Sequence, residues 1–420
     1  MGGANFTLNG VTYYWPQKPI VIVCIDGGDP AYIAQGIRDR IIPHTERCMR
    51  QGFSTIADGT VPSFTCPNNM SIVTGAEPVV HGISGNFYLE PTTRTPVVMT
   101  GPELLCSSTI LAEYARRGAK IVSITAKDKL RQQLQKGIDL RQGHISFSAQ
   151  YAEACTVPNN GIEDVLELVG MPQPDMYSAE LSLFVLEAGI KLLEQRRPDI
   201  TYLSLTDFIQ HKYAPHEPAA REFYQKLDHA FGRLLDLGAV LGLTADHGMN
   251  DKSKADGSPN VIWLQDILDE EFRPNRTTVI CPITDPFIAH HGSLAGFVRV
   301  YCNGATRPED VIRVIRELPG IASVWDKASA VKAFELAADR EGDVVVISEA
   351  GVCIGAAAHD HDLSGLEGHR LRTHGGVSEA KVPFIVSEPL NDVYWAQAAG
   401  RTLRSHNIFE YTINGTLQTL

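Results

Sequence analysis

Residues 19–28 read PIVIVCIDGG, an unbroken apolar run that ends in an aspartate and two glycines. A short β-branched run of this kind predicts a strand that is buried on both faces of a sheet. Similar runs follow at 119–126 (AKIVSITA), 199–205 (DITYLSL) and 238–245 (GAVLGLTA). Amphipathic helical patterns at 178–197 and 220–238 lie between these runs. The alternation predicts an α/β fold with a mostly parallel central sheet flanked by helices.

A separate pattern of strands and helices occupies residues 262–364. It includes the stretches GFVRVYC, RPEDVIRVIRELPG and DVVVISEAGVCIGA. We expect this segment to form a smaller α+β cap, inserted into a larger core made of residues 1–261 and 365–420. The chain is expected to return to the main sheet at VPFIVS, near residue 383.

The composition excludes several classes of partner. The chain of 420 residues carries a formal net charge of −12, so it lacks the broad basic surface that binds nucleic acid or an anionic membrane. No window reaches the roughly 18 apolar residues of a membrane span. Eight cysteines are scattered without Cys-x-x-Cys pairs, which is typical of reduced thiols. We therefore expect a cytoplasmic protein with no nucleic-acid and no membrane partner.

Polar residues follow three of the expected strands. Asp26 follows VIVCI, Asp207 follows TYLSLT, and Asp246 and His247 follow LGLTA. Each has an ordinary explanation, since aspartate is common in turns and at helix N-caps, and a histidine can close a strand. The carboxyl ends of strands in an open α/β sheet line one binding crevice, however. Their convergence therefore favours a shared site.

The residue types in these turns suit a divalent metal. Asp207 and His211 are four apart, which places them on one face of a helical turn. His374 lies in THGG, where glycines let the backbone bend. Oxygen and imidazole ligands without thiolate favour zinc in an open catalytic site, with manganese and iron left open.

The stretch SFTCPNNMSIVTG, residues 63–75, offers a hydroxyl at the start of a helix. Pro67 suits the first helical position, which places Thr65 just ahead of the helix, near unpaired amides that favour a phosphate. An ordinary N-cap is the alternative role for Thr65. Metal coordination is one way to lower the pKa of such a hydroxyl and make it a nucleophile.

Five stretches together resemble the alkaline phosphatase superfamily, within its nucleotide pyrophosphatase/phosphodiesterase-like branch. They are IDGGDP, FTCPNNMSIVTGAEPVVHGISGN, TDFIQHKYAPH, TADHGM and THGG, and they occur in that order, with Asp26 in the first and Gly376 at the end of the last. The resemblance implies an alkaline phosphatase-like fold and two zinc ions. One ion would be held by Asp207, His211 and His374, and the other by Asp26, Asp246 and His247, beside a nucleophilic Thr65 that also contacts metal. It further implies that Asn86 and His211 contact the substrate.

The segment TAKDKL suggests which substrate. Lys127 and Lys129 are two apart, and on an extended segment they would point to the same side, although such a pair is usually solvated. TAKDKL, TPVVMTGPELL and SGLEGHRLRTHGG are similar to the phosphonoacetate hydrolase family, in which two lysines engage the substrate carboxylate. The resemblance implies a small anionic phosphonate as the partner, split into acetate and phosphate through a phosphothreonine. Breaking a carbon–phosphorus bond leaves a carbanion, which nearby cations can stabilise as an enediolate.

Other functions remain as alternatives. A nucleotide pyrophosphatase/phosphodiesterase or a phosphoglycerate mutase would share the fold, although the serine nucleophile and larger insertion usual in the mutase are not evident. A sulfatase would need Cys-x-Pro-x-Arg, whereas here Cys66 adjoins Pro67 and no arginine follows. A non-catalytic metal-binding homologue is less favoured, because every candidate ligand is present. The oligomeric state is left open, with a homodimer among the assemblies considered.

Further histidines receive structural interpretations. HDHDLSGLEGH, residues 359–369, contains His359, His361 and His369 and is interpreted as a polar loop leading to His374. His290 and His291 are expected to be buried or to lie at the rim of the site. His44 and His81 are interpreted as structural.

Overall fold

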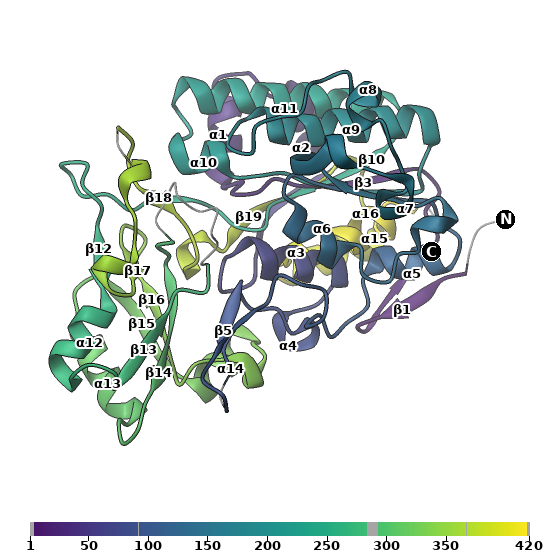
Figure 1. Ribbon diagram of the computed structural model, residues 1–420. Coiled ribbons are helices and arrows are strands. Elements are labelled where there is room, and N and C mark those ends of the chain that lie inside the picture. Colours follow the sequence, from purple (N-terminus) through teal and green to yellow (C-terminus); the bar gives the residue numbers. More distant parts are fainter. Residues whose placement is uncertain (1–3, 91, 284–292, 367, 418–420) are drawn as a thin grey trace.

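The computed structural model describes residues 4–90, 92–283, 293–366 and 368–417, and within them the largest sheet has seven strands (Figure 1). Their spatial order is β4 (Phe53–Asp58), β19 (Lys381–Val386), β10 (Val240–Thr244), β3 (Ile20–Cys24), β9 (Ile200–Ser204), β7 (Ile121–Thr125) and β8 (Ile145–Ser148). The five strands from β10 to β8 are parallel to one another, and β19 is antiparallel to both of its neighbours, β4 and β10. The prediction of a mostly parallel sheet is confirmed.

The unbroken apolar run in β3 has a direct structural cause. All five residues of β3 are buried. Val21 and Val23 belong to the core on one face of the sheet, whereas Ile20 and Ile22 belong to the core on the other. A strand that is covered on both faces needs no polar positions, so its sequence does not alternate.

Helices cover both faces of the sheet (Figure 1). One face packs against α1 (Pro30–Arg38), α2 (Pro43–Gln51), α9 (Glu180–Arg196) and α11 (Pro218–Asp236). The other packs against α3 (Thr65–Thr74), α5 (Ile110–Arg116), α6 (Asp128–Leu134) and α16 (Ile408–Ile413). The two long predicted helices thus correspond to α9 and α11.

The start of α3 differs from the prediction. The helix begins at Thr65, so Pro67 is its third residue and not its first. A proline costs no hydrogen bond here, because the first N–H groups of a helix have no acceptor within it. The helix therefore begins two residues earlier than predicted. The expectation that Thr65 precedes the helix is wrong, since Thr65 is its first residue.

A smaller antiparallel sheet lies beside the main body, in green in Figure 1. Its strands, in spatial order, are β13 (Thr277–Ile280), β14 (Phe297–Cys302), β16 (Val344–Ser348) and β15 (Ile321–Asp326). They enclose a separate apolar core with α12 (Leu264–Phe272), α13 (Pro308–Arg316) and α14 (Lys327–Phe334). The boundaries 262 and 364 for a cap remain a prediction.

The remaining elements are short. They are β1 (Phe6–Leu8), β2 (Val11–Tyr13), α4 (Pro78–His81), β5 (Phe87–Leu89), β6 (Pro96–Val98), α7 (Val157–Asn160), α8 (Val165–Val169), α10 (Phe208–Lys212), β11 (Asn250–Asp251), β12 (Val261–Trp263), β17 (Cys353–Gly355), β18 (Arg372–Thr373) and α15 (Asp392–Gly400).

Buried arginines tie the smaller sheet to the main body. Arg299, on β14, is fully buried and pairs with Glu341 at 2.6 Å. The same guanidinium donates to the carbonyl and the hydroxyl of Ser84, at 2.9 and 3.0 Å. Arg340 donates to the carbonyls of Gly82 and Leu104. The loop after α4 is therefore held from the side of the smaller sheet.

All eight cysteines lie within the described residues, and none of them forms a disulfide there. Across the described ranges, no helix combines the length and the apolar character that crossing a bilayer would require.

Asp228 offers a test of how the helices are held together. This buried α11 residue caps the start of α2, since its carboxylate accepts from the N–H of His44 at 3.1 Å and from the N–H and hydroxyl of Thr45 at 2.6 and 2.7 Å. Asp228→Ala should reduce stability by about 1–3 kcal/mol, because buried donors lose their acceptor. Calorimetric melting should show a lower transition temperature. Asp236→Ala, at the exposed end of the same helix, is the control, and equal melting of both variants would contradict the capping role.

Candidate functional site

Three neighbouring strands bring acidic residues to one edge of the main sheet. Strand β3 lies between β9 and β10, and Asp26, Asp207 and Asp246 follow these three strands. Neighbouring strands are about 4.8 Å apart, so side chains just beyond their ends lie close together. The predicted convergence is therefore what the sheet order produces.

Asp207, His211 and His374 form the first group of candidate ligands. Their ligand atoms lie within 4.8 Å of one another, and all three residues are buried. Asp207 Oδ2 is 2.8 Å from His211 Nε2 and 3.7 Å from His374 Nε2. Asp207 occupies the N-cap position of α10 but makes no capping hydrogen bond with its side chain. The alternative that Asp207 serves only as a helix cap is thus not supported.

Asp26, Asp246 and His247 form the second group, again buried and within 4.8 Å of one another. His247 Nε2 is 3.2 Å from Asp26 Oδ1. Asp246 Oδ1 accepts from the backbone N–H of Gly27 at 3.2 Å and of His247 at 3.0 Å. Backbone donors therefore hold the Asp246 carboxylate at the end of β10.

Thr65 lies against the second group. Its Oγ1 is 3.5 Å from Asp26 Oδ1 and 3.4 Å from His247 Nε2. As the first residue of α3, Thr65 also lies where unpaired helix N–H groups favour an anion. The hydroxyl, the metal ligands and the helix start are therefore together, as the sequence predicts. The roles themselves remain a proposal.

The three candidate histidine ligands share one tautomer. Nδ1 of His211 donates to the carbonyl of Arg372 at 2.7 Å, and Nδ1 of His374 donates to the carbonyl of Ser63 at 2.7 Å. Nδ1 of His247 lies 2.9 Å from the carbonyl of its neighbour Gly248. A carbonyl can only accept, so the proton is on Nδ1 and Nε2 faces the carboxylates. Metal-binding histidines are typically oriented in this way.

Glycine at position 27 lets two of the strand ends approach each other. Gly27 has φ +66°, and a Cβ added there would lie 3.1 Å from Cβ of Asp207 and 3.2 Å from Cβ of Gln210. A side chain at this position would be strained and crowded. The glycine in IDGG is thus required by the close approach of the loops that carry Asp26 and Asp207.

The electrostatics of the two groups favour bound cations. Burial and the nearby carboxylate of Asp26 raise the pKa of Asp246 well above its usual range. Burial also raises the pKa of Asp207, but His211, Lys127 and His374 outweigh this effect and hold it well below its usual range. Like charges at this depth are costly unless they are paired with a cation.

The pKa values of two candidate histidine ligands are also shifted, in opposite directions. The rings of His247 and His374 stack with their centroids 3.5 Å apart. Burial lowers the pKa of His247, yet Asp246 and Asp26 raise it to about 10. Burial, together with His247 and His211, lowers the pKa of His374 well below its usual range. A divalent ion in each group would satisfy the carboxylates and bind unprotonated imidazole nitrogens. The residues present therefore fit two metal ions.

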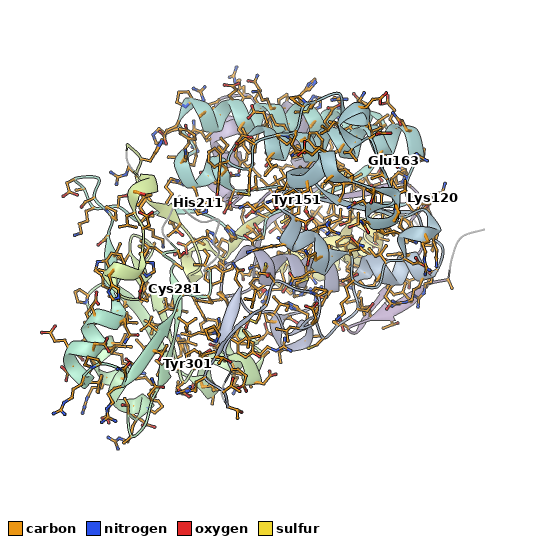
Figure 2. All side chains as sticks on the ribbon, viewed as in Figure 1. Lys120, Tyr151, Glu163, His211, Cys281 and Tyr301 are labelled. Carbon is orange, nitrogen blue, oxygen red and sulfur yellow. The ribbon has the colours of Figure 1, made fainter. Side chains whose placement is uncertain are left out.

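One cavity of about 370 Å³ is lined by all three residues of the first group and by Asp26 of the second. It is lined by Asp26, Phe64, Thr65, Cys66, Asn86, Thr100, Lys127, Asp128, Lys129, Leu130, Gln132, Gln150, Tyr151, Met176, Leu205, Asp207, His211, Ile283 and His374. The size is in the range of small-molecule sites. Figure 2 labels His211 and Tyr151, which line this cavity from the main body. It also labels Cys281 and Tyr301, which belong to the part of the chain with the smaller sheet.

Lys127 and Lys129 line this cavity, but not as an extended pair. Lys127 is the N-cap of α6, and Lys129 lies in the first turn of that helix. The expected extended geometry is therefore wrong, because the strand β7 ends at Thr125. The structure nevertheless brings both lysines to the cavity, and Lys127 Nζ is 4.0 Å from Asp207 Oδ1.

Hydrogen bonds from residues at the ends of two strands hold the turn at residues 127–129, which carries both lysines. The hydroxyl of Thr125 donates to the carbonyl of Lys127 at 2.9 Å. The N–H of Asp128 donates to Oε1 of Gln150 at 3.0 Å, and the hydroxyl of Ser148 donates to Oδ1 of Asp128 at 3.0 Å. The turn is thus positioned by residues at the ends of β7 and β8.

Asn86 lines the same cavity and is held by the segment that precedes β14. Its N–H donates to the carbonyl of Pro282 at 2.6 Å, and Nδ2 donates to the carbonyl of Ile283 at 3.2 Å. The predicted residues His290 and His291 lie outside the described residues.

The other histidines lie apart from the two candidate ligand groups. His361 Nε2 accepts from the N–H of Ala356 at 2.8 Å, within the loop interpreted as polar. His81 is buried, and its Nε2 is 2.9 Å from the hydroxyl of Ser71. His44 lies at the first turn of α2. Among the described residues, neither metal-ligand group includes a histidine from the 359–369 loop.

Sequence reasoning missed several cavity residues, among them Gln150, Tyr151, Met176 and Thr100. Gln150 and Tyr151 follow β8, a strand that was not predicted from its four residues ISFS. Recognising that strand would have placed both residues at the carboxyl edge of the sheet. Thr100 and Met176 lie outside helices and strands and have no comparable local signal.

Comparison with known families matches most of the chain. The family model described as type I phosphodiesterase / nucleotide pyrophosphatase matches residues 20–376. A curated relative is an uncharacterized pyrophosphatase/phosphodiesterase of Schizosaccharomyces pombe, 22% identical over 280 residues, which are 64% of this chain. The chain spans about half the length of that relative, since the match covers 50% of it.

Solved structures are similar over nearly the whole chain. Phosphonoacetate hydrolase from Sinorhizobium meliloti, in complexes with phosphonoformate and with phosphonoacetate, is 41% identical. That match covers 99% of this chain and 100% of the other, with a TM-score of 0.94. Murine ectonucleotide pyrophosphatase/phosphodiesterase 5 is 16% identical, with a TM-score of 0.62 and coverage of 95% and 96% of the two chains. This last likeness concerns the fold alone.

Removal of divalent cations should destabilise the protein. Chelation would leave the buried carboxylates of Asp26 and Asp246 facing each other, so we expect a lower melting temperature that added Zn²⁺ or Mn²⁺ restores. An ion present at a hundred times its dissociation constant stabilises by about 2.7 kcal/mol. Calorimetry with metal analysis would measure both effects.

The matched control is His359→Ala, which removes an exposed histidine of the 359–369 loop. This variant should show the same change in melting temperature on chelation as the parent protein. A protein that contains no divalent metal, and melts at the same temperature with and without chelator and added ion, would contradict the bimetallic site.

Proposed function

The chain belongs to the type I phosphodiesterase / nucleotide pyrophosphatase family and is a hydrolase, and from this premise we propose that it hydrolyses the carbon–phosphorus bond of phosphonoacetate. The products are acetate and phosphate. The observation that carries the proposal is that one cavity is lined by Thr65, by the pair Lys127 and Lys129, by all three candidate ligands of the first group and by Asp26 of the second. Similarity to phosphonoacetate hydrolase over the whole chain supports it.

We propose zinc as the metal at both groups of ligands, because carboxylate and imidazole donors without thiolate suit an open catalytic zinc site. When bound, the two ions lower the pKa of the threonine hydroxyl and neutralise charge on the phosphoryl oxygens. Asp207, His211 and His374 would hold one ion, and Asp26, Asp246 and His247 the other.

The first step in the proposed reaction is attack by Thr65 Oγ1 on phosphorus. The hydroxyl of Thr65 gives its proton to water, a bond forms between Oγ1 and phosphorus while the carbon–phosphorus bond breaks, and the electron pair of that bond passes to the leaving carbon. Asn86 binds a phosphoryl oxygen through its side-chain amide, and His211 lies close to the bound substrate. Water then attacks phosphothreonine, the bond between phosphorus and Oγ1 breaks, and the hydroxyl of Thr65 is regenerated with release of phosphate.

Lys127 and Lys129 stabilise the departing group. The electron pair left on carbon is delocalised into the carboxylate as an enediolate, which then takes a proton from water to give acetate. Two ammonium groups directed at that carboxylate bind it more tightly as its charge grows. Removing one donor of this kind can cost about 3 kcal/mol.

A nucleotide pyrophosphatase/phosphodiesterase activity is the second candidate, supported by the family model. An ester leaving group carries its charge on oxygen and needs no carboxylate-binding pair. Lys127 and Lys129 at the same cavity therefore favour the phosphonate. A cytoplasmic setting is proposed because none of the eight cysteines is paired in a disulfide, as is usual for proteins of reducing compartments.

Thr65→Ala tests the nucleophile. We expect kcat for phosphonoacetate to fall by about 10³-fold or more, because no hydroxyl remains to form the covalent intermediate, while the metal content stays near two ions. Phosphate release and elemental analysis measure the two quantities. Thr65→Ser, which keeps a hydroxyl, is the control and should retain much more activity. Turnover unchanged in Thr65→Ala would reject the role.

Lys129→Ala tests the substrate assignment. Turnover of phosphonoacetate should fall by about 10²-fold, while turnover of an aryl phosphate changes little, because its leaving group has no carboxylate. Lys129 is preferred to Lys127, which also faces the metal ligand Asp207. Lys120→Ala is the control, since Lys120 is exposed and precedes the same strand β7 (Figure 2). Equal losses on both substrates would contradict the assignment.

A further inference from the structure

Asn69 lies on α3, one turn after Thr65, and is fully buried. Its carbonyl oxygen Oδ1 accepts from the hydroxyl of Tyr202 at 2.7 Å and from the hydroxyl of Ser204 at 3.1 Å, both on β9. Its amide nitrogen Nδ2 donates to Oδ2 of Asp246 at 3.1 Å and to the carbonyl of Thr65 at 3.0 Å.

These four bonds use the whole capacity of the side chain. A carboxamide has two acceptor positions on oxygen and two N–H donors on nitrogen. Because Tyr202 and Ser204 can donate to Oδ1, the nitrogen is directed at the two groups that can only accept, the Asp246 carboxylate and the Thr65 carbonyl. The orientation of the amide is therefore determined by its partners and not by packing alone.

The hydrogen bond from Asn69 gives the carboxylate of Asp246, a candidate metal ligand, its third donor. Oδ1 of Asp246 accepts from the backbone N–H groups of Gly27 and His247, and Oδ2 accepts from Asn69. Partners of this kind orient ligating carboxylates, and their loss typically costs 10- to 100-fold in metal affinity or activity. The same amide also holds the backbone of Thr65, so one side chain connects the nucleophile to a ligand.

We propose that Asn69 is a positioning residue that sets the distance between Thr65 and the metal held by Asp26, Asp246 and His247. The proposal rests on the proposed function for the role of Thr65. The amide nitrogen of Asn69 binds both Thr65 and Asp246. Its oxygen is held in place by the hydroxyls of Tyr202 and Ser204 on β9.

Only an amide serves all four partners. An aspartate at this position would place a carboxylate about 3 Å from Oδ2 of Asp246, where two like charges repel. An apolar residue would leave the buried hydroxyls and the Asp246 oxygen without this partner. The stretch TCPNN thus contains an asparagine whose chemistry, and not only its size, is required.

Asn68 provides a matched control on the same helix. It is equally buried, and its side chain binds the backbone of the preceding loop, at Thr60, Pro62 and Phe64. No hydrogen bond in this set reaches a candidate metal ligand. Asn68→Ala therefore removes a buried amide of the same kind without touching Asp246.

The experiment compares Asn69→Ala, Tyr202→Phe and Asn68→Ala with the parent protein. Calorimetric titration of the metal-free protein with Zn²⁺ gives two affinities, and anomalous diffraction from crystals soaked in limiting Zn²⁺ assigns them to sites. In Asn69→Ala the site of Asp26, Asp246 and His247 should weaken by about 10- to 100-fold, while the site of Asp207 keeps its affinity. Turnover of phosphonoacetate should lose kcat with little change in KM.

Tyr202→Phe keeps the amide but removes a donor to Oδ1, so it should cause a smaller loss at the same site, and it decides the question if Asn69→Ala fails to fold. Asn68→Ala should lower the melting temperature without a selective loss at either site. Equal weakening of both sites in Asn69→Ala, or no weakening, would overturn the proposal. The metal readout is independent of phosphonoacetate, so a wrong substrate would leave this test intact.

Discussion

The constraint on which the structure depends is the burial of three carboxylates, Asp26, Asp207 and Asp246, beyond the ends of three adjacent strands. Charges at such depth are tolerated only when donors and cations surround them. The fold supplies backbone N–H groups to Asp246 and a glycine at 27 that allows two loops to meet. It also directs Nε2 of each candidate histidine ligand towards a carboxylate. Without a metal, the three buried carboxylates cost folding free energy, and a bound cation offsets that cost.

The convergence of these ligands could be predicted because two local rules were sufficient. An unbroken apolar run indicates a parallel strand covered on both faces, and the carboxyl ends of such strands share one edge. Asp207 and His211 were linked by helical spacing alone. His374 was different, since it follows β18, a strand of two residues that pairs with β11. The glycines of THGG are its one local signal, and the order of motifs in a known superfamily assigned it to the same group as Asp207 and His211.

What could not be predicted depends on tertiary context. The edge strands β4 and β8 mix polar with apolar residues, so neither has the unbroken apolar pattern of the central strands, and the cavity residues Gln150 and Tyr151 were missed with β8. The helix α3 starts at Thr65 because a proline is harmless throughout the first turn. The lysines meet the cavity from a helix start and not from a strand. In each case the residues were visible in the sequence, but the backbone that presents them was set by packing.

The two sides of the cavity are built differently, and this difference bears on how the substrate is recognised. Most candidate metal ligands follow central strands, where the carboxylates of Asp26, Asp207 and Asp246 are buried. The groups proposed to meet the substrate come from turns: Lys127 and Lys129 from the turn after β7, and Asn86 from a loop held by Pro282 and Ile283. Of these residues, Lys127 also faces the carboxylate of Asp207, at 4.0 Å. Under the proposed function, the choice of substrate therefore depends on Lys127 and Lys129, which recognise the leaving group, and not on the candidate metal ligands.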